Sequence, residues 1–334
     1  MNGTLKDKTK VLVTGAGGFV GSHLAEALIK KGNEVVGLLA PEEDSPWIKN
    51  IEAAFIYGDI NDKGSLYKAV EGIEYIYHLA SLLGRSQGEK IYQTNFGGTK
   101  NLVDVCLDLG IKLKRFLFVS SVAAMGPAQK KEIFDEEVRC KPVSDYGRSK
   151  LLAEQFLNSV KTRLPITIVR LPLVYGPRSF WGLFYLYKVI NKGILIDIGQ
   201  AETTVGFITD IVNGMISASE SPIAAGETYH LGEEKTYSTN EVMNIIAKAL
   251  GKKTVRLKIP YSVLSLTALL FELNAKITGT KPVFQRQAVT DYFKHRYWRV
   301  DVSKAKREFG FEAKVPFETG AKITADWYKK EGFI

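Results

Sequence analysis

Cysteine and long apolar runs are scarce in this sequence of 334 residues. The two cysteines, Cys106 and Cys140, are too few for a disulfide framework and favour a reducing compartment. No run approaches the roughly 20 apolar residues that span a bilayer. The opening MNGTLKDKTK lacks the apolar core of a secretory signal. From these absences we expect a cytoplasmic protein.

Metal-ligand spacings and nucleic-acid motifs are also missing. His23, His230 and His295 show no ligand spacing, so we interpret them as structural and predict no metal site. The net charge is +9, but no block of five or more like charges occurs. The excess positive charge fits either a basic surface with no dedicated partner or attraction to an anion, such as a phosphate-bearing cofactor or an acidic substrate. Nucleic acid is disfavoured, and so is a membrane surface.

The first half of the sequence alternates between strand and helix patterns. The expected strands span 10–15, 33–39, 53–59, 74–80, 115–121 and 166–171. The expected helices span 21–32, 63–72, 98–110 and 145–160, with Cys106 in the core. Strands separated by helices predict a parallel sheet covered on both faces. We therefore expect an α/β fold, with a doubly wound Rossmann domain over residues 1–172.

The second half is less regular and predicts a smaller substrate-binding region over residues 173–334. Its expected elements are a loop at 173–180, a helix at 181–193, a strand and helix within 203–220, and a helix at 237–251. Segments around 203–235 are expected to return to the first domain. Ser238 or Thr239 is expected to cap the last of these helices, and Gly251 to end it. The apolar segment 261–279 is interpreted as core or as a lid over a pocket, in preference to a membrane-surface helix.

The stretch VLVTGAGGFVGSHLAEAL holds two overlapping glycine frames. The frame G-x-G-x-x-G is incomplete because Val20 stands where its third glycine is needed. The frame G-x-x-G-x-x-G is complete with Gly15, Gly18 and Gly21. Glycines between a strand and a helix let the backbone approach a phosphate, and the free N–H groups of the helix then face it. This context predicts a dinucleotide site.

The end of the second strand bears on the choice between NAD and NADP. Leu39 and Ala40 occupy the positions where an acidic residue would favour NAD and an arginine NADP. Glu42, Glu43 and Asp44 follow and would repel a 2′-phosphate if they reach it. They fit a solvated loop equally well, so the sequence leans only weakly to NAD. Asp59 either contacts adenine or caps the turn that follows it.

Tyr146 and Lys150 are four residues apart at the start of a predicted helix, and so share one face. A nearby ammonium lowers a tyrosine pKa and lets the phenol exchange protons near neutral pH. A bare Tyr–Lys spacing is common and by itself fits an ordinary surface pair. Ser120 and Ser121 end a strand at the edge of the sheet where ligands bind, and a hydroxyl there can bind a reacting oxygen. The spacing does not decide which of the two serines faces the site.

The sequence resembles the extended short-chain dehydrogenases/reductases, also called the NAD-dependent epimerase/dehydratase family, over nearly its whole length. The matching segments are TGAGGFVG, GDI, YHLA, TNFGGTKNL, FVSSVAAMG, PVSDYGRSKLLAEQ, VRLPLVYGPR, FITDIV and WRVDVSKAKREFGF. The resemblance selects the frame Gly15, Gly18 and Gly21. It implies that Tyr146 is the catalytic acid/base, that Lys150 binds the nicotinamide ribose and lowers the tyrosine pKa, and that Ser121 holds the reacting oxygen. Asn95 would support the active site.

The same resemblance implies a set of cofactor-contacting residues. They are Gly15, Gly18, Phe19, Val20, Gly21, Asp59, Ile60, Leu79, Ala80, Ser81, Tyr146, Lys150 and Pro172. Family members often dimerise through the helices that correspond to GTKNLVDVCLDL and GRSKLLAEQFLNSV, so a homodimer is expected.

Two reaction classes of this family compete, because one fold supports both. Nucleotide-sugar epimerases and dehydratases carry two arginines that neutralise the substrate diphosphate. This sequence has Thr203 at the position of the first arginine, and it lacks the RPGD segment that contains the second. The segment YWRVDVSKAKREFGF instead resembles the 3β-hydroxysteroid dehydrogenase and dihydroflavonol reductase branch. Phe180, Trp181, Phe184, Tyr185 and Tyr187 fit a core or an apolar pocket. We expect an NAD(P)-dependent oxidoreductase acting on a small, apolar alcohol or ketone, and a non-catalytic nucleotide sensor is disfavoured by the Tyr–Lys pair.

Overall fold

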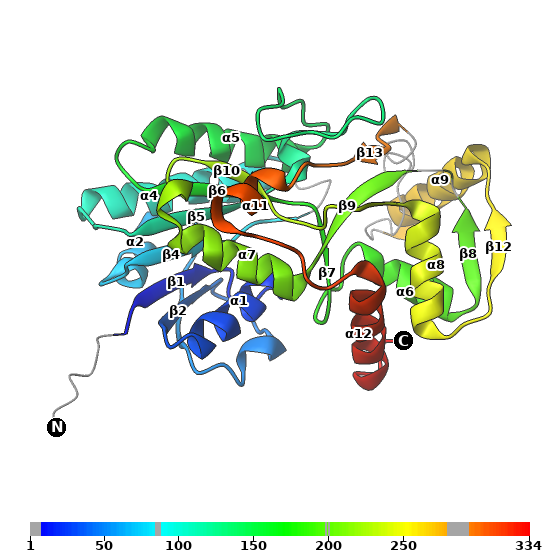
Figure 1. Cartoon of the computed structure of the whole chain (residues 1–334), viewed down its shortest axis with the longest axis horizontal. Coiled ribbons are helices and arrows are strands. Elements are labelled where there is room, and N and C mark those ends of the chain that lie inside the picture. Colours follow the sequence, from blue (N-terminus) through cyan, green and yellow to red (C-terminus); the bar gives the residue numbers. More distant parts are fainter. Residues whose placement is uncertain (1–7, 84–87, 198, 200, 279–293) are drawn as a thin grey trace.

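A sheet of seven parallel strands forms the centre of the molecule (Figure 1). The structure is a computed structural model that describes residues 8–83, 88–197, 199, 201–278 and 294–334. In order across the sheet, the strands are β10 (Thr228–His230), β6 (Ile166–Leu171), β5 (Arg115–Ser121), β4 (Tyr75–His78), β1 (Lys10–Thr14), β2 (Glu34–Leu39) and β3 (Ala54–Tyr57). The strand order reverses between β1 and β4, which creates the crevice where such folds bind ligands. The predicted doubly wound Rossmann fold is confirmed.

Helices cover both faces of this sheet because successive strand residues point to opposite sides. On β1, Val11 and Val13 belong to one core, whereas Leu12 belongs to the other. The first core is covered by α1 (Phe19–Lys30) and α7 (Ile208–Glu220). The second core is covered by α2 (Lys63–Leu66), α4 (Gly98–Asp108) and α5 (Asp145–Val160), and it contains Cys106, as predicted.

A smaller set of elements, on the right of Figure 1, lies beside the main sheet. Its sheet contains β11 (Thr236–Ser238), β9 (Glu202–Phe207), β13 (Tyr297–Trp298) and β7 (Leu173–Tyr175). Its other elements are α6 (Leu183–Asn191), α8 (Thr239–Leu250), α9 (Tyr261–Thr278), α12 (Phe317–Lys330), and the strand pair β8 (Ile194–Asp197) and β12 (Val255–Lys258). Between β9 and β11, the chain returns to the main sheet to form α7 and β10.

Local signals explain several helix ends. Ser238 caps α8 in a capping box with Glu241, and the helix ends at Gly251 in the left-handed conformation, both as predicted.

The prediction of a loop over 173–180 is wrong for its first three residues, which form β7. This strand exists because it pairs with β9, and the partner is distant in sequence. The remaining short elements are α3 (Glu89–Tyr92), α11 (Ser303–Phe309), a π-helical turn (Gln93–Gly97), and 3₁₀ turns at Pro46–Ile48, Lys68–Val70, Val122–Ala124 and Pro222–Ala224.

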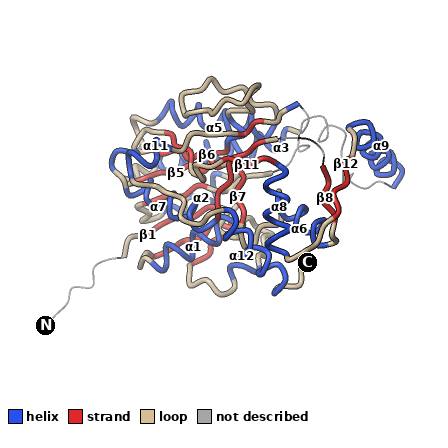
Figure 2. Tube along the Cα trace, turned by 45° about the vertical axis from the view of Figure 1, so that its right-hand side comes forward, coloured by secondary structure: helices blue, strands red, loops and turns tan. Residues whose placement is uncertain are grey.

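Helix α9 lies beside β8 and β12 at one side of the molecule in Figure 1, and it is the outermost element on that side in Figure 2. Leu266 and Leu270 on this helix are each 58% exposed. The expectation that this segment belongs to the core is therefore wrong for the face that bears these two leucines. None of the helices in the described part of the chain is long and apolar enough to cross a membrane.

Candidate active site

The glycine loop joins β1 to α1 at the crevice between β1 and β4. Gly15 has a φ of 68°, which suits glycine, and Gly18 occupies the N-cap of α1. No side chain caps this helix, and no acidic residue lies in its first turn. Its first N–H groups are therefore available to an anion, which the helix dipole also favours. Phe19 and Val20 supply the first two residues of this turn.

Gly21 distinguishes the two glycine frames by geometry. A Cβ added at Gly21 would lie 2.1 Å from the carbonyl oxygen of Gly15, and neither backbone can move aside without disrupting the turn. A Cβ at Gly17 would meet the Oε1 atom of Glu43 at 2.3 Å, which a flexible side chain can relieve. The position that requires glycine for backbone packing is thus Gly21, in the frame that begins with Gly15 and Gly18.

Part of the acidic segment after β2, residues 42–44, packs against the glycine loop. The Oε2 atom of Glu43 accepts a hydrogen bond from the N–H of Ala40 at 3.1 Å, and the hydroxyl of Ser45 donates to the carbonyl of Gly17 at 2.7 Å. Glu42 and Asp44 are exposed. One carboxylate of the three therefore lies beside the glycine loop, where it would repel a 2′-phosphate, and the other two are solvated.

Asp59 and Ile60 follow β3 at the same edge of the sheet. The Asp59 carboxylate accepts hydrogen bonds from the backbone N–H and the side chain of Asn61, both at 2.9 Å. It therefore caps the turn, as one of its two interpretations predicted, while Asp62 caps α2. Ile60 is buried and packs over Gly98 at the start of α4.

A chain of buried hydrogen bonds leads from β1 to the loop after β4. The Oγ1 atom of Thr14 accepts from the N–H groups of Leu79 and Ala80, at 3.1 and 3.0 Å, so its own proton is donated to Nδ1 of His78 at 2.7 Å. His78 in turn donates from Nε2 to Thr99 at 2.9 Å. Burial lowers the pKa of His78 to about 3, so the ring is neutral. This chain fixes the loop that the resemblance places along the cofactor.

Asn95 lies in the π-helical turn Gln93–Gly97 and connects two parts of the site. Its Oδ1 accepts from the N–H of Leu82 at 2.7 Å and the hydroxyl of Ser81 at 3.2 Å. Its Nδ2 donates to Ser149 at 2.9 Å, and Ser149 donates to the carbonyl of Tyr146 at 2.8 Å. Asn95 thus joins the loop after β4 to the first turn of α5.

Ser121, Tyr146 and Lys150 lie together where β5 meets α5. Burial raises the pKa of Tyr146 to about 12, and the nearby hydroxyls of Ser121 and Ser81 oppose this shift without outweighing it. The Nζ of Lys150 lies 6.0 Å from the centre of the Tyr146 ring and donates to the carbonyl of Val119 at 2.9 Å. In the protein chain alone, the pKa of Tyr146 is therefore raised, and the lowering by Lys150 that the sequence led us to expect is not seen.

Ser120, the other serine of the strand, faces away from this group. Its hydroxyl donates to Oε1 of Glu154, and three hydrogen bonds of 2.7–3.2 Å join Glu154 to Arg170. All three side chains are buried. Of the two serines, Ser121 therefore faces Tyr146. The Glu154–Arg170 pair was not predicted from the sequence. Its only signal there is that Glu154 follows Lys150 by one helical turn.

Burial lowers the pKa of Lys150 to about 7, and the charge of Glu154 opposes this shift. Lys150 is only 2% exposed, and its ammonium also lies 4.8 Å from the centre of the Phe118 ring. Glu154 therefore helps to keep Lys150 protonated, and a protonated lysine is the form that can hold a ribose hydroxyl by donating hydrogen bonds.

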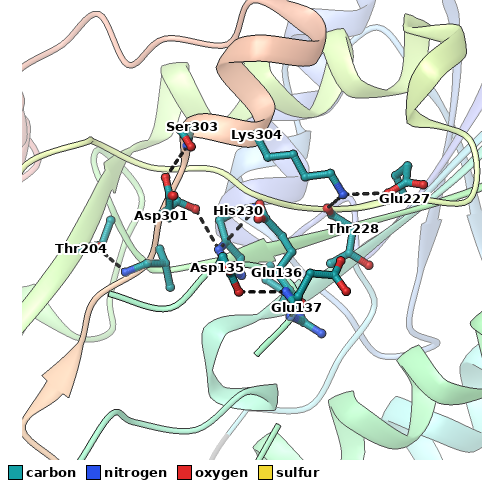
Figure 3. Close-up of polar contacts among 12 residues, drawn as sticks. Asp135, Glu136, Glu137, Thr204, Glu227, Thr228, His230, Asp301, Ser303 and Lys304 are labelled. Atoms are coloured by element: carbon teal, nitrogen blue, oxygen red, sulfur yellow. Dashed lines mark hydrogen bonds and ion pairs between the residues drawn. The ribbon is translucent and has the colours of Figure 1, made fainter. Parts of the chain in front are cut away.

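The segment after Ser121 is joined to the C-terminal part of the chain by a second polar cluster (Figure 3). The N–H of His230 donates to Glu136 at 2.9 Å, and its Nδ1 donates to the carbonyl of Asp301 at 3.0 Å. Bridges between Ala128 and Tyr297 and between Phe134 and Val300 run alongside. Burial lowers the pKa of His230 to about 3, which agrees with a structural role. No group of three His, Cys, Asp or Glu residues suited to a metal occurs among the described residues.

The aromatic residues of α6 and the segment before it mostly serve packing. Tyr187 is fully buried, and its hydroxyl donates to the carbonyl of Ala321. Phe180 and Phe184 contact each other and aromatic side chains near the C-terminus. Trp181 and Tyr185 are 64% and 57% exposed. The core interpretation therefore holds for three of the five. Pro172 lies between β6 and β7, beside Gly232.

Comparison with known proteins gives consistent results. A model of the NAD dependent epimerase/dehydratase family matches residues 11–232. The short-chain dehydrogenase/reductase family 42E member 1 of Xenopus laevis is 26% identical and covers 100% of this chain and 91% of its own length. The decarboxylating sterol-4-alpha-carboxylate 3-dehydrogenase of Mus musculus is 27% identical and covers 95% and 90%. The structure of UDP-glucuronic acid 4-epimerase from Bacillus cereus, in complex with UDP-glucuronic acid and NAD, has a TM-score of 0.76 and 26% identity, covering 97% of this chain and 100% of that one.

The chain therefore belongs to the NAD-dependent epimerase/dehydratase family, as its sequence motifs indicated. It is an enzyme, and its chemistry is NAD-dependent oxidoreduction. The lean of the sequence toward NAD is confirmed.

Proposed function

We propose that the protein transfers a hydride between NAD and the hydroxyl or ketone carbon of a small, apolar substrate. The observation that carries the proposal is the meeting of Ser121, Tyr146 and Lys150 at the ligand edge of the sheet. We further propose that residues 1–172 bind the dinucleotide and that residues 173–334 hold the substrate. The mouse sterol dehydrogenase and the Xenopus short-chain dehydrogenase/reductase support this choice over a sensor.

The glycine loop and Lys150 are the parts of the chain that fit NAD. The uncapped first turn of α1 suits its pyrophosphate, and the carboxylate of Glu43 disfavours NADP. When bound, NAD supplies hydride transfer at its nicotinamide ring. Lys150 would then bind the ribose, and the loop Leu79–Ser81, held by Thr14 through the N–H groups of Leu79 and Ala80 and by Asn95 through Ser81, would line the cofactor.

Tyr146 moves the proton in this mechanism. Because its pKa is raised to about 12, the hydroxyl is protonated at neutral pH and can donate to a ketone oxygen during reduction. Ser121 binds the same oxygen through its hydroxyl and stabilises its developing charge. Asn95 holds the loop and the helix that carry these groups at a fixed distance, through Ser81 and Ser149.

The surroundings of β9 favour an uncharged substrate over a nucleotide sugar. Thr203 stands where the epimerases carry an arginine that binds the diphosphate. Two cations near this strand, Lys131 and Arg299, both form ion pairs with Glu202, at 2.8 and 3.5 Å. Their charge is thus already compensated, which supports a substrate without a diphosphate.

The substitution Tyr146→Phe tests the proton-transfer role. We expect turnover to fall by at least about a hundredfold, the typical contribution of general acid–base catalysis. NAD affinity, measured by fluorescence titration, is expected to stay within about threefold because Lys150 and the glycine loop are intact. Thr167→Ser, at the buried start of β6 and so at the opposite end of the strand from the residues that pair with Ser120 and Ser121, serves as the control and should turn over normally. Near-normal turnover by Tyr146→Phe would refute the mechanism.

A substrate panel distinguishes this proposal from the epimerase alternative, which the Bacillus cereus enzyme represents. The protein is incubated with NAD and either hydrophobic alcohols or UDP-sugars. Formation of NADH with alcohols alone supports the proposal. Interconversion of sugar isomers without net NADH would instead assign the protein to the epimerases.

We also propose a homodimer, formed through the helices predicted for that role, α4 and α5. Leu152 on α5 is 39% exposed, and Leu109, just after α4, is 50% exposed. Light scattering on wild-type protein and on Leu152→Glu tests this, because a charge at a dimer interface should shift the mass to that of a monomer.

A further inference from the structure

An exposed apolar stripe runs along α9. It is formed by Val263, Leu266, Leu270, Leu273 and Ile277, which are 50%, 58%, 58%, 46% and 85% exposed. Their spacing of three and four residues places them on one side of the helix. Scattered exposed apolar side chains are ordinary, but a contiguous stripe of this length marks an interaction surface.

The rest of the exposed side of α9 carries no charge among its described side chains. Thr267 and Asn274, which flank the stripe, are polar and uncharged. Glu272 is half-buried, on the side of Ala268 and Ala275, which are buried. A helix that only borders water in a protein of this kind has charged residues on its outer side. The outer side of α9 is therefore suited to an environment less polar than water.

Exposed basic side chains precede α9 in the sequence. Lys252, Lys253, Arg256 and Lys258 precede α9 and are all exposed, and β12 adds the exposed Val255 and Leu257. In the sequence, the stretch 252–296 holds nine Lys and Arg residues and two Asp and Glu residues. The rest of the chain is close to neutral, since the whole has 45 basic and 36 acidic residues. The net charge of the protein is thus concentrated in the stretch of sequence that contains α9.

We propose that the α9 surface, defined as the exposed side chains of residues 252–278, binds the face of an anionic lipid bilayer. The apolar stripe would enter the boundary between headgroups and acyl chains, and the lysines would contact anionic headgroups. The helix lies on the bilayer and does not cross it, in keeping with its length and polarity. A second copy of the chain is a poorer occupant, because helix pairs use charged residues beside such a stripe, and the described side chains that flank it on one side, Thr267 and Asn274, are uncharged.

Vesicle flotation tests the proposal on the full-length protein. Vesicles of phosphatidylcholine alone are compared with vesicles containing about one third phosphatidylglycerol. We expect binding to the anionic vesicles in 50 mM salt, weak binding to the neutral ones, and a marked loss of binding in 500 mM salt because salt screens the lysine contribution. Absence of binding to anionic vesicles at low salt would overturn the proposal.

Two double variants separate the two contributions. Leu270→Ser/Leu273→Ser should weaken binding at least about tenfold through lost apolar contact. Lys252→Gln/Lys253→Gln should weaken it about fivefold for each lysine and reduce the salt dependence. Matched controls are Ile223→Ser, which removes a side chain that is 57% exposed elsewhere, and Lys68→Gln/Lys330→Gln. These controls should bind as the wild type does.

Circular dichroism and NAD titration verify that each variant is folded, which is expected because the substituted side chains are exposed and lie outside the active site. Equal vesicle binding by wild type and Leu270→Ser/Leu273→Ser would refute the proposal. The proposal would also be refuted if the wild type bound no vesicles and Leu270→Ser/Leu273→Ser changed the protein from a dimer to a monomer. The stripe would then be an interface between two copies of the chain. The outcome is independent of the substrate, so it can fail while the proposed reaction holds.

Discussion

The buried pair of Glu154 and Arg170 gives the most demanding test of the structure. The substitution Glu154→Gln keeps the shape of the side chain and removes its charge. Arg170 then remains in the core with its guanidinium unpaired, and Ser120 loses a charged acceptor. The side chains of the pair are 2% and 7% exposed, so water cannot take the place of the lost partner.

The expected loss follows from this burial. Removing one member of a buried ion pair costs about 3–5 kcal/mol, because the remaining charge has lost its hydration and its partner. The partly exposed pair of Glu26 and Arg178, with side chains that are 32% and 18% exposed, provides the comparison. Solvent screens that pair more, so we expect Glu26→Gln to cost no more than about 1 kcal/mol.

Urea unfolding followed by circular dichroism measures both changes as differences in the free energy of unfolding, provided that the urea dependence is unchanged. The double variant Glu154→Leu/Arg170→Met removes both charges and should recover at least half of the loss caused by Glu154→Gln. The reasoning is refuted if Glu154→Gln costs less than about 1 kcal/mol, or if the double variant is no more stable than the single one.

Two other substitutions test the glycine loop and a buried acid. Gly21→Ala should abolish NAD binding and destabilise the fold, because its methyl group would lie 2.1 Å from the carbonyl oxygen of Gly15. The control Gly32→Ala has no atom in the way and should cost only about 1 kcal/mol of backbone strain. Calorimetric titration measures NAD binding by both variants, and thermal melts measure their stability. Burial raises the pKa of Glu233 from 4.5 to about 7. Between these values, the folded chain holds a proton that the unfolded chain has released, so the free energy of unfolding falls as pH rises, by up to about 1.4 kcal/mol per pH unit. Glu233→Gln should flatten this dependence between pH 5 and 7, and an unchanged slope would contradict the assignment.

The part of the fold that depends on local pattern could be predicted from the sequence. The alternation of strands and helices, and the glycine spacing after β1, follow from short-range periodicity and backbone freedom, and both are present. β7 was missed because its three residues become a strand only by pairing with β9.

Side-chain arrangements across elements were harder to predict. Tyr146 and Lys150 were found because both lie on one helix. Glu154 and Arg170 were missed because their meeting depends on how α5 packs over β6. The tyrosine pKa was misjudged for a related reason. The spacing shows that a lysine is near, but it does not show how much water the folded chain removes from the hydroxyl.

The bridges between residues 128–134 and 297–300 have a consequence for how the protein is made. A hydrogen bond from Arg299 to the carbonyl of Lys131 spans 168 positions of the chain. On the ribosome, strands and helices of the N-terminal half can begin to form while the remainder of the chain is still being synthesised. The segment that follows Ser121 gains these partners only when the C-terminal part emerges. A nascent chain can thus possess the strands of its parallel sheet before the segment after Ser121 has its partners, and a premature stop before residue 297 would remove those partners altogether.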